Sequence, residues 1–281
     1  MSLVQIIDCP RDAIQGIASF IPTQKKVAYI QAALNSGVLA AVDFGSFVSP
    51  AAVPQMADTA EVLEQLDLSS TSTELLAIVA NLKGIHQAVT FPKISWLGYP
   101  FSVSETFQQR NARTTREASL DVVAEAVGIA AAQNKQVRVY ISMGFGNPYG
   151  DDWSEELVSE YVGRLAEVGV THFALSDTTG EATVQGIGSL YSTLTSHFPE
   201  MNFSAHLHAT PLDWLPKVEA AYEAGCRTFD GAMLGYGGCP FAKDQLVGNI
   251  PTEGLISRFA PDRVDLLPQF QSQFESLISH V

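Results

Sequence analysis

Short apolar runs rich in β-branched residues alternate with longer segments of helical period along the whole chain. Runs that are apolar on both faces are typical of parallel strands covered by helices. Eight such runs predict strands at Leu3–Ile7, Leu39–Phe44, Leu75–Ala80, Ile94–Gly98, Val137–Met143, His172–Ser176, Asn202–His208 and Arg227–Met233. Helices are predicted at Thr23–Ser36, Thr59–Leu66, Leu82–Thr90, Thr115–Asn134, Ser154–Val168, Thr183–His197, Asp213–Ala224 and from Thr252 onward.

Eight strand–helix units in about 250 residues indicate a (β/α)8 TIM barrel. A doubly wound open sheet would have fewer units and usually a GxGxxG loop after its first strand, which this chain lacks. No low-complexity linker divides the sequence, so we expect one α/β domain over residues 1–281. The segment Val264–Val281 predicts an extra C-terminal helix.

Residues at the ends of the predicted helices support these boundaries. Ser154 and Asp213 stand where an N-cap side chain would bind the first free backbone amides. Gly37, Gly169 and Gly225 stand where a helix commonly ends in a left-handed residue.

Composition and charge narrow the class of protein. The net charge of −14 argues against nucleic acid or an anionic membrane as the main partner. Cys9, Cys226 and Cys239 are odd in number and scattered, which favours a reducing compartment over a disulfide framework. No signal peptide and no apolar run of about 18 residues is present. These features predict a cytoplasmic protein.

Unusual polar residues follow the predicted strands, where a barrel places its functional groups. They are Arg11 and Asp12 after the first strand, Asp43 ending the second, Ser102, Glu105 and Asn111 after the fourth, Asp177 and Thr178 after the sixth, His206 and His208 ending the seventh, and the Gly-Gly-Cys-Pro turn after the eighth. This clustering predicts an enzyme.

His206 and His208 are two residues apart in a predicted strand, so both imidazoles point to one face. With Asp12 and Asn249 they form a mixed nitrogen and oxygen ligand set that suits Mg²⁺, Mn²⁺, Fe²⁺ or Co²⁺. A structural zinc site would more often have paired cysteines. The alternatives are two polar residues on an exposed edge, or one core histidine and one solvent histidine. Both are less favourable in a buried barrel strand, because unliganded imidazoles are costly to bury.

Two further features have alternative interpretations. Arg11 and Asp12 form either an ordinary surface ion pair or a guanidinium beside a metal, which would stabilise a developing enolate. Cys239 is either a small buried side chain or, on a loop rich in glycine, a mobile acid or base.

Ordered motifs along nearly the whole chain resemble the hydroxymethylglutaryl-coenzyme A (HMG-CoA) lyase branch of the metal-dependent TIM-barrel lyases and condensing enzymes. The motifs that carry the resemblance are Pro10-Arg11-Asp12 with Gln15, the segments 46–50 (SFVSP), 53–58 (VPQMAD) and 81–84 (NLKG), Ser102-x-Ser104-Glu105-x-Phe107 with Asn111, Asp177-Thr178-x-Gly180, His206-x-His208, and the segment 235–242 (GYGGCPFA) with Gly248-Asn249.

The resemblance implies retro-Claisen cleavage of 3-hydroxy-3-methylglutaryl-CoA, or a close 3-hydroxyacyl-CoA, to acetyl-CoA and acetoacetate. It implies Mg²⁺ or Mn²⁺ on Asp12, His206, His208 and Asn249. It implies that Arg11 stabilises the enolate, that Asp43 supports either Arg11 or the metal shell, and that Cys239 assists proton transfer on a mobile loop. Asp177 and Glu253 match carboxylates with supporting or acid–base roles.

The resemblance also bears on partners. Lys83, Arg110 and Arg113, with Asn111, are candidates for contacts with coenzyme A, although the three cations could equally be solvated surface charges. A homodimer is expected by resemblance alone. The pathway, whether leucine degradation or ketone-body formation, stays open.

Several positions depart from the family pattern. Ala209 replaces a carboxylate next to a ligand, Ile7 replaces an acid, and Cys9 and Ala13 replace glycines. Losing a group that supports a metal ligand commonly weakens affinity or activity by about 10–100-fold. Two alternatives therefore remain: an aldolase or condensing enzyme acting on a 2-oxo acid, and a barrel that binds metal or acyl-CoA with reduced or reassigned activity.

Overall fold

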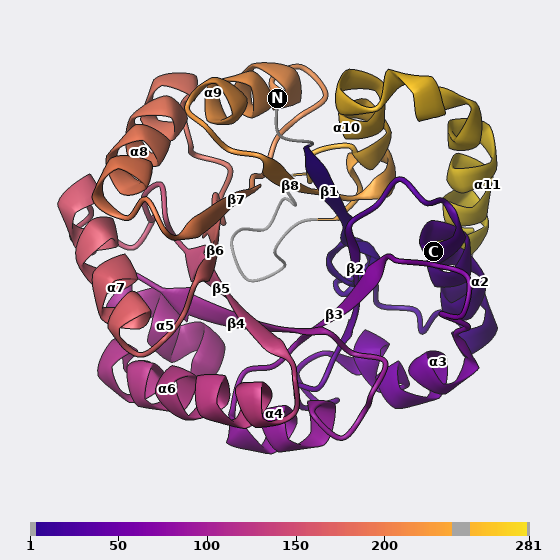
Figure 1. Cartoon of the computed structure of the whole chain (residues 1–281), viewed down its shortest axis with the longest axis horizontal. Helices are drawn as coiled ribbons and strands as arrows, with labels where there is room; N and C mark the ends of the chain where they lie inside the picture. Colours follow the sequence, from indigo (N-terminus) through magenta and orange to yellow (C-terminus); the bar gives the residue numbers. More distant parts are fainter. Residues whose placement is uncertain (1–3, 238–247, 280–281) are drawn as a thin grey trace.

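Eight parallel strands form the centre of the molecule. The computed structural model describes residues 4–237 and 248–279. Within them the strands close into a barrel in the order β1 to β8, and β8 pairs back onto β1. Viewed down the barrel, the helices surround the strands as an outer ring (Figure 1). The predicted (β/α)8 barrel is confirmed.

The strands and helices have the following bounds. The strands are β1 Gln5–Asp8, β2 Ala41–Ser46, β3 Glu74–Ile78, β4 Trp96–Ser102, β5 Gln136–Ser142, β6 His172–Ser176, β7 Asn202–His206 and β8 Thr228–Gly231. The α-helices are α1 Pro10–Ile14, α2 Thr23–Asn35, α3 Thr59–Gln65, α4 Leu82–Ala88, α5 Glu105–Ala112, α6 Arg116–Ala132, α7 Glu155–Glu167, α8 Val184–His197, α9 Trp214–Glu223, α10 Thr252–Phe259 and α11 Leu267–Ile278. The 3-10 helices are η1 Pro54–Met56, η2 Met233–Gly235 and η3 Pro261–Leu266.

All eight predicted strands are present, but some boundaries differ. β4 continues past Gly98 to Ser102 and includes Pro100. β3 pairs with β4 only up to Gly98, so Pro100 lies where one side of the strand has no ladder partner and the missing N–H is tolerated. β7 ends at His206, and His208 forms an isolated bridge with Asn249 instead.

Two other expectations were wrong in detail, and two helices were not predicted. Asp43 lies within β2 rather than at its end. Helix α1 has only five residues and helix α5 (ETFQQRNA) is largely polar, so neither shows a clear apolar period. Asp213 does precede α9, but its carboxylate accepts from the Thr210 amide at 2.6 Å and makes no cap bond to the helix.

Other boundary predictions are confirmed. The Ser154 hydroxyl accepts from the Leu157 amide at 3.2 Å and caps α7. Gly37, Gly169 and Gly225 have φ values of 62°, 100° and 101°, the left-handed backbone that ends a helix and favours glycine.

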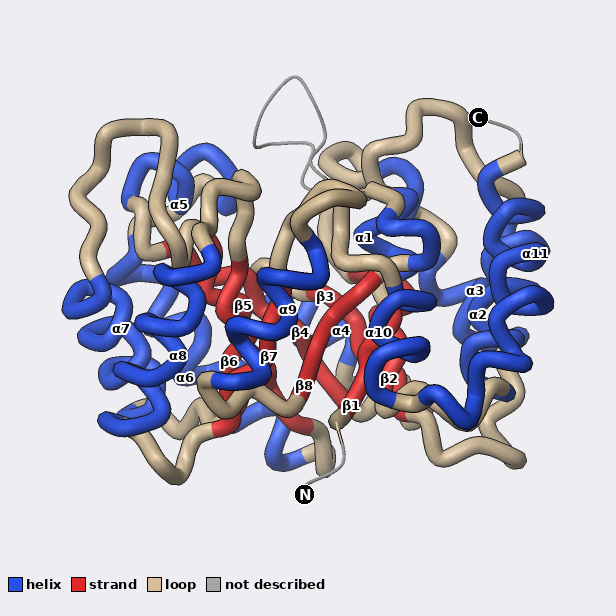
Figure 2. Tube along the Cα trace, turned by 90° about the horizontal axis from the view of Figure 1, so that it is seen from above, coloured by secondary structure: helices blue, strands red, loops and turns tan. Residues whose placement is uncertain are grey.

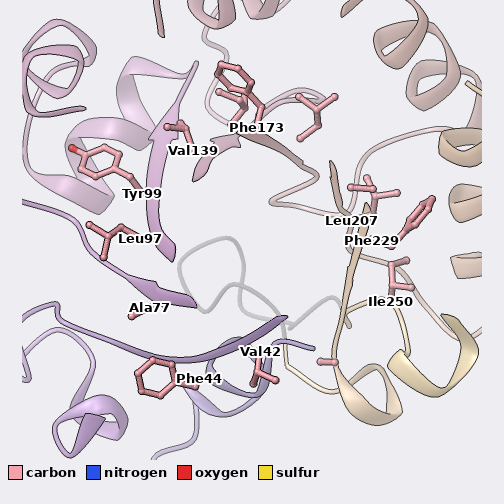
Figure 3. Packing of buried hydrophobic residues seen from close by; sticks show 14 of the residues in the cluster. Val42, Phe44, Ala77, Leu97, Tyr99, Val139, Phe173, Leu207, Phe229 and Ile250 are labelled. Carbon is pink, nitrogen blue, oxygen red and sulfur yellow. The ribbon is translucent and has the colours of Figure 1, made fainter. Parts of the chain in front are cut away.

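The main core lies between the strands and the helices. Val42, Phe44, Leu97 and Phe173 point outward from the barrel into this layer (Figure 3). The predicted C-terminal helix is present as α11 and packs on α2, where Phe270 stacks on Tyr29 with ring centroids 5.2 Å apart. Among the described residues, no helix is long and apolar enough to cross a membrane.

A buried acid lies in this outer layer, at the end of β1. Asp8 is fully buried and accepts hydrogen bonds from Tyr29 of α2 (2.8 Å) and Thr252 of α10 (2.6 Å). Burial raises the pKa of Asp8 to about 7, and the two hydroxyl donors only partly oppose this. The folded chain holds the Asp8 proton more tightly than the unfolded chain does. Protonated Asp8 therefore contributes to the free energy of unfolding in full below pH 4, and this contribution is lost as the pH rises through 7.

We therefore expect Asp8→Asn to become progressively more stable than wild type between pH 5 and pH 8. The shift corresponds to a gain of up to about 4 kcal/mol in the free energy of unfolding. Urea denaturation at several pH values measures this difference. Asp121→Asn, at an exposed position of α6, is the control. A difference that does not change with pH would contradict the assignment.

Candidate active site

Asp12, His206 and His208 meet at the carboxyl end of the barrel. One potential ligand atom from each lies within 4.8 Å of the others, and all three side chains are buried. Asp12 comes from the one-turn helix α1, His206 from the end of β7, and His208 from the segment directly after it. The structure thus brings these three predicted residues together.

The hydrogen bonds of the two imidazoles leave one nitrogen of each ring for a ligand. Nδ1 of His206 lies 3.0 Å from Oδ2 of Asp230, and Nδ1 of His208 lies 3.1 Å from the carbonyl oxygen of Thr178. A carboxylate and a carbonyl accept hydrogen bonds, so Nδ1 of each ring carries a proton, and a neutral ring then keeps the Nε2 lone pair for a ligand. Burial, and then the neighbouring His206, lower the pKa of His208, which keeps it neutral.

Asn249 completes the cluster from the other end of the chain. Its side-chain amide donates to Asp12 Oδ2 and to the Tyr236 carbonyl, each at 2.9 Å. Gly248 permits this approach, because a Cβ there would lie 2.7 Å from the carbonyl oxygen of Gly235. The Gly248 carbonyl accepts from the Ala209 amide at 2.7 Å. Ala209 thus joins the segment that carries His208 to the segment that carries Asn249.

Arg11 lies beside this cluster in a fixed orientation. Its Nε and Nη2 contact Asp43 Oδ2 at 3.0 and 2.5 Å, and its Nη1 contacts Asp12 Oδ1 at 3.0 Å and Gln15 Oε1 at 3.1 Å. Burial would lower the pKa of Arg11, but Asp43 and Asp12 outweigh it and raise that pKa above its ordinary value. Among the described residues, one Nη2 proton has no acceptor and can donate to a substrate oxygen.

The cluster fits a divalent metal ion. Nε2 of His208 is buried and has no hydrogen-bond partner among the described residues, which is costly unless a ligand occupies that position. Burial tends to raise the pKa of Asp12, but the Arg11 guanidinium opposes it, together with the hydrogen bond from the Asn249 amide, and that pKa lies below its usual range. An ionised carboxylate, two neutral imidazoles and an amide are donors that Mg²⁺, Mn²⁺, Fe²⁺ and Co²⁺ accept.

Asp177 lies one contact away from the cluster. It forms an ion pair with Lys217 (3.0 Å), whose ammonium also donates to the His208 carbonyl at 2.8 Å. Glu253 is farther out and accepts from the Leu234 amide at 2.9 Å. Burial raises the pKa of Glu253. Asp177 therefore supports the backbone of a ligand, and Glu253 holds the turn after β8.

The residues predicted near coenzyme A lie on exposed positions after β3 and β4. Lys83 is in the first turn of α4, while Arg110, Asn111 and Arg113 are on or next to α5. The guanidinium of Arg110 lies over the Tyr149 ring, 4.7 Å from its centroid. Helix α5 lies at the same end of the barrel as α1 (Figure 2). Cys239 lies outside the described residues.

Sequence reasoning missed three residues that support the cluster: Asp230, Arg138 and Lys217. Asp230 and Arg138 are single charges inside otherwise apolar strands. In the sequence Lys217 resembles an ordinary lysine of a surface helix. In the structure it is only 4% exposed and forms an ion pair with Asp177. A charged residue at a buried strand position is the only signal in the sequence that points to Asp230 and Arg138.

A closed parallel barrel with ionisable side chains gathered at its carboxyl end defines a TIM-barrel enzyme. The HMGL-like family model matches residues 4–272, and the chain belongs to the HMGL-like family. It is 32% identical over 256 residues to the cytoplasmic 3-hydroxy-3-methylglutaryl-CoA lyase of Homo sapiens, covering 90% of this chain and 68% of that protein. It is 30% identical over 247 residues to a hydroxymethylglutaryl-CoA lyase of Bacillus subtilis, and the match covers 88% of this chain and 81% of that protein.

A solved structure agrees with these relatives. The HMG-CoA lyase of Acinetobacter baumannii, determined in complex with coenzyme A and 3-methylmalate, superimposes with a TM-score of 0.89 at 31% identity. The match covers 99% of this chain and 92% of that chain. The family resemblance inferred from the sequence motifs is confirmed.

Proposed function

We propose that the protein is a carbon–carbon lyase that cleaves 3-hydroxy-3-methylglutaryl-CoA to acetyl-CoA and acetoacetate. The observation that carries the proposal is the fixed Arg11 guanidinium beside the cluster of Asp12, His206, His208 and Asn249. This places a permanent cation next to a site for a divalent ion, an arrangement suited to a substrate that develops negative charge on oxygen. The relatives named HMG-CoA lyase support the substrate.

In the proposed reaction the C3 hydroxyl loses its proton and the C2–C3 bond breaks. The C3 fragment leaves as the ketone acetoacetate, and C2 becomes the enolate of acetyl-CoA, which then takes up a proton. Arg11 donates a hydrogen bond from its remaining Nη2–H to the thioester oxygen and stabilises the enolate, keeping its own proton and charge. Asp43 accepts hydrogen bonds from two nitrogens of the Arg11 guanidinium, so the guanidinium does not have to change orientation during the reaction.

Asp12, His206, His208 and Asn249 would hold Mg²⁺ or Mn²⁺, which when bound supplies Lewis-acid polarisation of the substrate oxygens. Arg110, Arg113 and Lys83 would contact the coenzyme A phosphates, with Asn111 beside them. Cys239 would assist the transfer of the proton to C2. The complex of the Acinetobacter baumannii enzyme with coenzyme A supports an acyl-CoA substrate.

The oligomeric state and the cellular compartment of the protein are part of the same proposal. We infer that the protein is a cytoplasmic homodimer. Named relatives include both cytoplasmic and mitochondrial lyases, and the cytoplasmic ones support the compartment proposed here.

We expect the purified protein, supplied with Mg²⁺ or Mn²⁺, to release acetoacetate from 3-hydroxy-3-methylglutaryl-CoA. The measurement is coupled detection of acetoacetate, with chelator-treated protein as the control. Absence of cleavage by metal-loaded protein would overturn the proposal. In that event, consumption of acetyl-CoA together with a 2-oxo acid would indicate a condensing enzyme. Stoichiometric metal binding without turnover would indicate a barrel with reassigned activity.

A further inference from the structure

The histidine ligand His206 is held from inside the barrel by a buried carboxylate. Asp230 of β8 is 3% exposed, and its Oδ2 lies 3.0 Å from Nδ1 of His206. This contact holds the ring through Nδ1 and leaves Nε2 as the ring nitrogen available to a ligand. The side chain of Cys9 lies within the same group, with its sulfur within 4.8 Å of ligand atoms of His206 and Asp230.

Asp230 is in turn held by Arg138 of β5, on the far side of the barrel. Nη2 of Arg138 donates to Asp230 Oδ1 at 2.7 Å and to the Ser204 hydroxyl at 2.6 Å. Burial tends to raise the pKa of Asp230, but Arg138 and then His206 outweigh it and keep that pKa below its usual range. A buried carboxylate without this partner would be strongly unfavourable.

An aromatic ring closes the arrangement. The guanidinium of Arg138 lies over the Tyr140 ring, 4.9 Å from its centroid, and Nη1 donates to the Tyr140 hydroxyl at 3.3 Å. The same ring meets His206 edge-on, with centroids 5.3 Å apart and planes at 90°. Arg138, Asp230, His206 and Tyr140 therefore form a closed group in which each member contacts the next.

Arg138 reaches this group from the end of the barrel opposite the candidate active site. It lines a cavity of about 270 Å³ together with Gln5, Glu74, Gln136 and Asn202, which begin their strands. Arg138 thus lies away from the carboxyl end, where the substrate would bind, and its contact with the cluster passes through Asp230.

We propose that Asp230 and Arg138 are positioning residues that set the tautomer and orientation of His206 for the metal. The inference rests on the metal site of the proposed function. The competing explanation is an ion pair that only stabilises the barrel interior. Metal ligands that are hydrogen-bonded in this way typically lose about 10–100-fold in metal affinity when the supporting group is removed. A purely structural pair would change stability but not metal affinity.

The test compares Mn²⁺ binding by wild type and by Asp230→Asn, measured by calorimetry without substrate, together with thermal unfolding. Asp58→Asn is the matched control, because Asp58 forms a buried ion pair with Lys26 (2.7 Å) between α2 and α3. We expect Asp230→Asn to weaken Mn²⁺ binding by about 10–100-fold and Asp58→Asn to leave it unchanged. Equal Mn²⁺ affinity in wild type and Asp230→Asn would overturn the proposal, as would a wild-type protein that binds no Mn²⁺.

A second measurement does not depend on whether Asp230→Asn folds. Long-range ¹H–¹⁵N spectra of the metal-free wild-type protein report which ring nitrogen of each histidine carries the proton, and His206→Gln assigns the signal. We expect the Nδ1–H tautomer, and the Nε2–H tautomer would overturn the proposal. Both measurements omit substrate, so a protein that binds Mn²⁺ but fails to cleave 3-hydroxy-3-methylglutaryl-CoA would refute the proposed activity and leave this inference standing.

Discussion

Replacing His208 with alanine is expected to abolish stoichiometric binding of Mn²⁺. His208 is 2% exposed, and its Nε2 has no partner among the described residues. Its removal takes away a ligand itself, so the loss should exceed the roughly 10–100-fold that follows loss of a supporting contact. Calorimetric titration with Mn²⁺ measures the effect, and the cleavage rate should fall with it.

The control for this prediction is His197→Ala, an exposed histidine in α8 on the outside of the barrel. It should bind Mn²⁺ as wild type does. Thermal unfolding of both variants separates loss of the ligand from loss of the fold. A folded His208→Ala protein that still binds one Mn²⁺ per chain would refute the assignment of His208 as a ligand.

Replacing Arg11 with lysine is expected to lower kcat at saturating Mn²⁺ by about 10²–10³-fold, the range found when one donor to a developing oxyanion is lost. Lysine keeps the positive charge that buried Asp43 requires, but it cannot present the planar fork that contacts Asp43, Asp12 and Gln15 together. The substitution therefore removes the oriented donor while limiting damage to the fold.

The accompanying change in metal affinity makes the Arg11 prediction specific. Arg11 contacts Asp12 directly, at 3.0 Å, and competes with a metal ion for that carboxylate. Weakening the contact should leave Mn²⁺ affinity at or above the wild-type value while kcat falls. Arg258→Lys, in an exposed ion pair with Glu219, is the control. Weaker Mn²⁺ binding together with unchanged kcat would contradict the proposed role.

The fold was predictable from the sequence because buried parallel strands must be apolar on both faces. The short helix α1 was not, because five residues carry no period that distinguishes a helix from a loop. The candidate ligands Asp12, His206, His208 and Asn249 were recognisable as residue types suited to metal, each standing at or after the end of a strand. Their convergence depends on the closure of the barrel, which brings β8 onto β1.

The supporting residues were harder to predict for a physical reason. Asp230 and Arg138 are 92 residues apart in sequence, and each alone resembles a stray charge in an apolar strand. They stabilise each other only by pairing across the barrel interior, and no local sequence pattern predicts this pairing. Likewise Ala209 suggested lost support for His208, whereas the Thr178 carbonyl provides a partner for its Nδ1 at 3.1 Å.

The contact between Asn249 and Asp12 joins residues 237 positions apart. At a translation rate of about 5–20 residues per second, roughly 10–50 s separate the synthesis of these two side chains. A nascent chain thus contains Asp12 long before Asn249 has been synthesised. For a similar time β1 lacks its second neighbour in the sheet, β8. With the proposed metal site, high-affinity capture of metal should therefore report the closure of the barrel during biosynthesis, after Asn249 has been made.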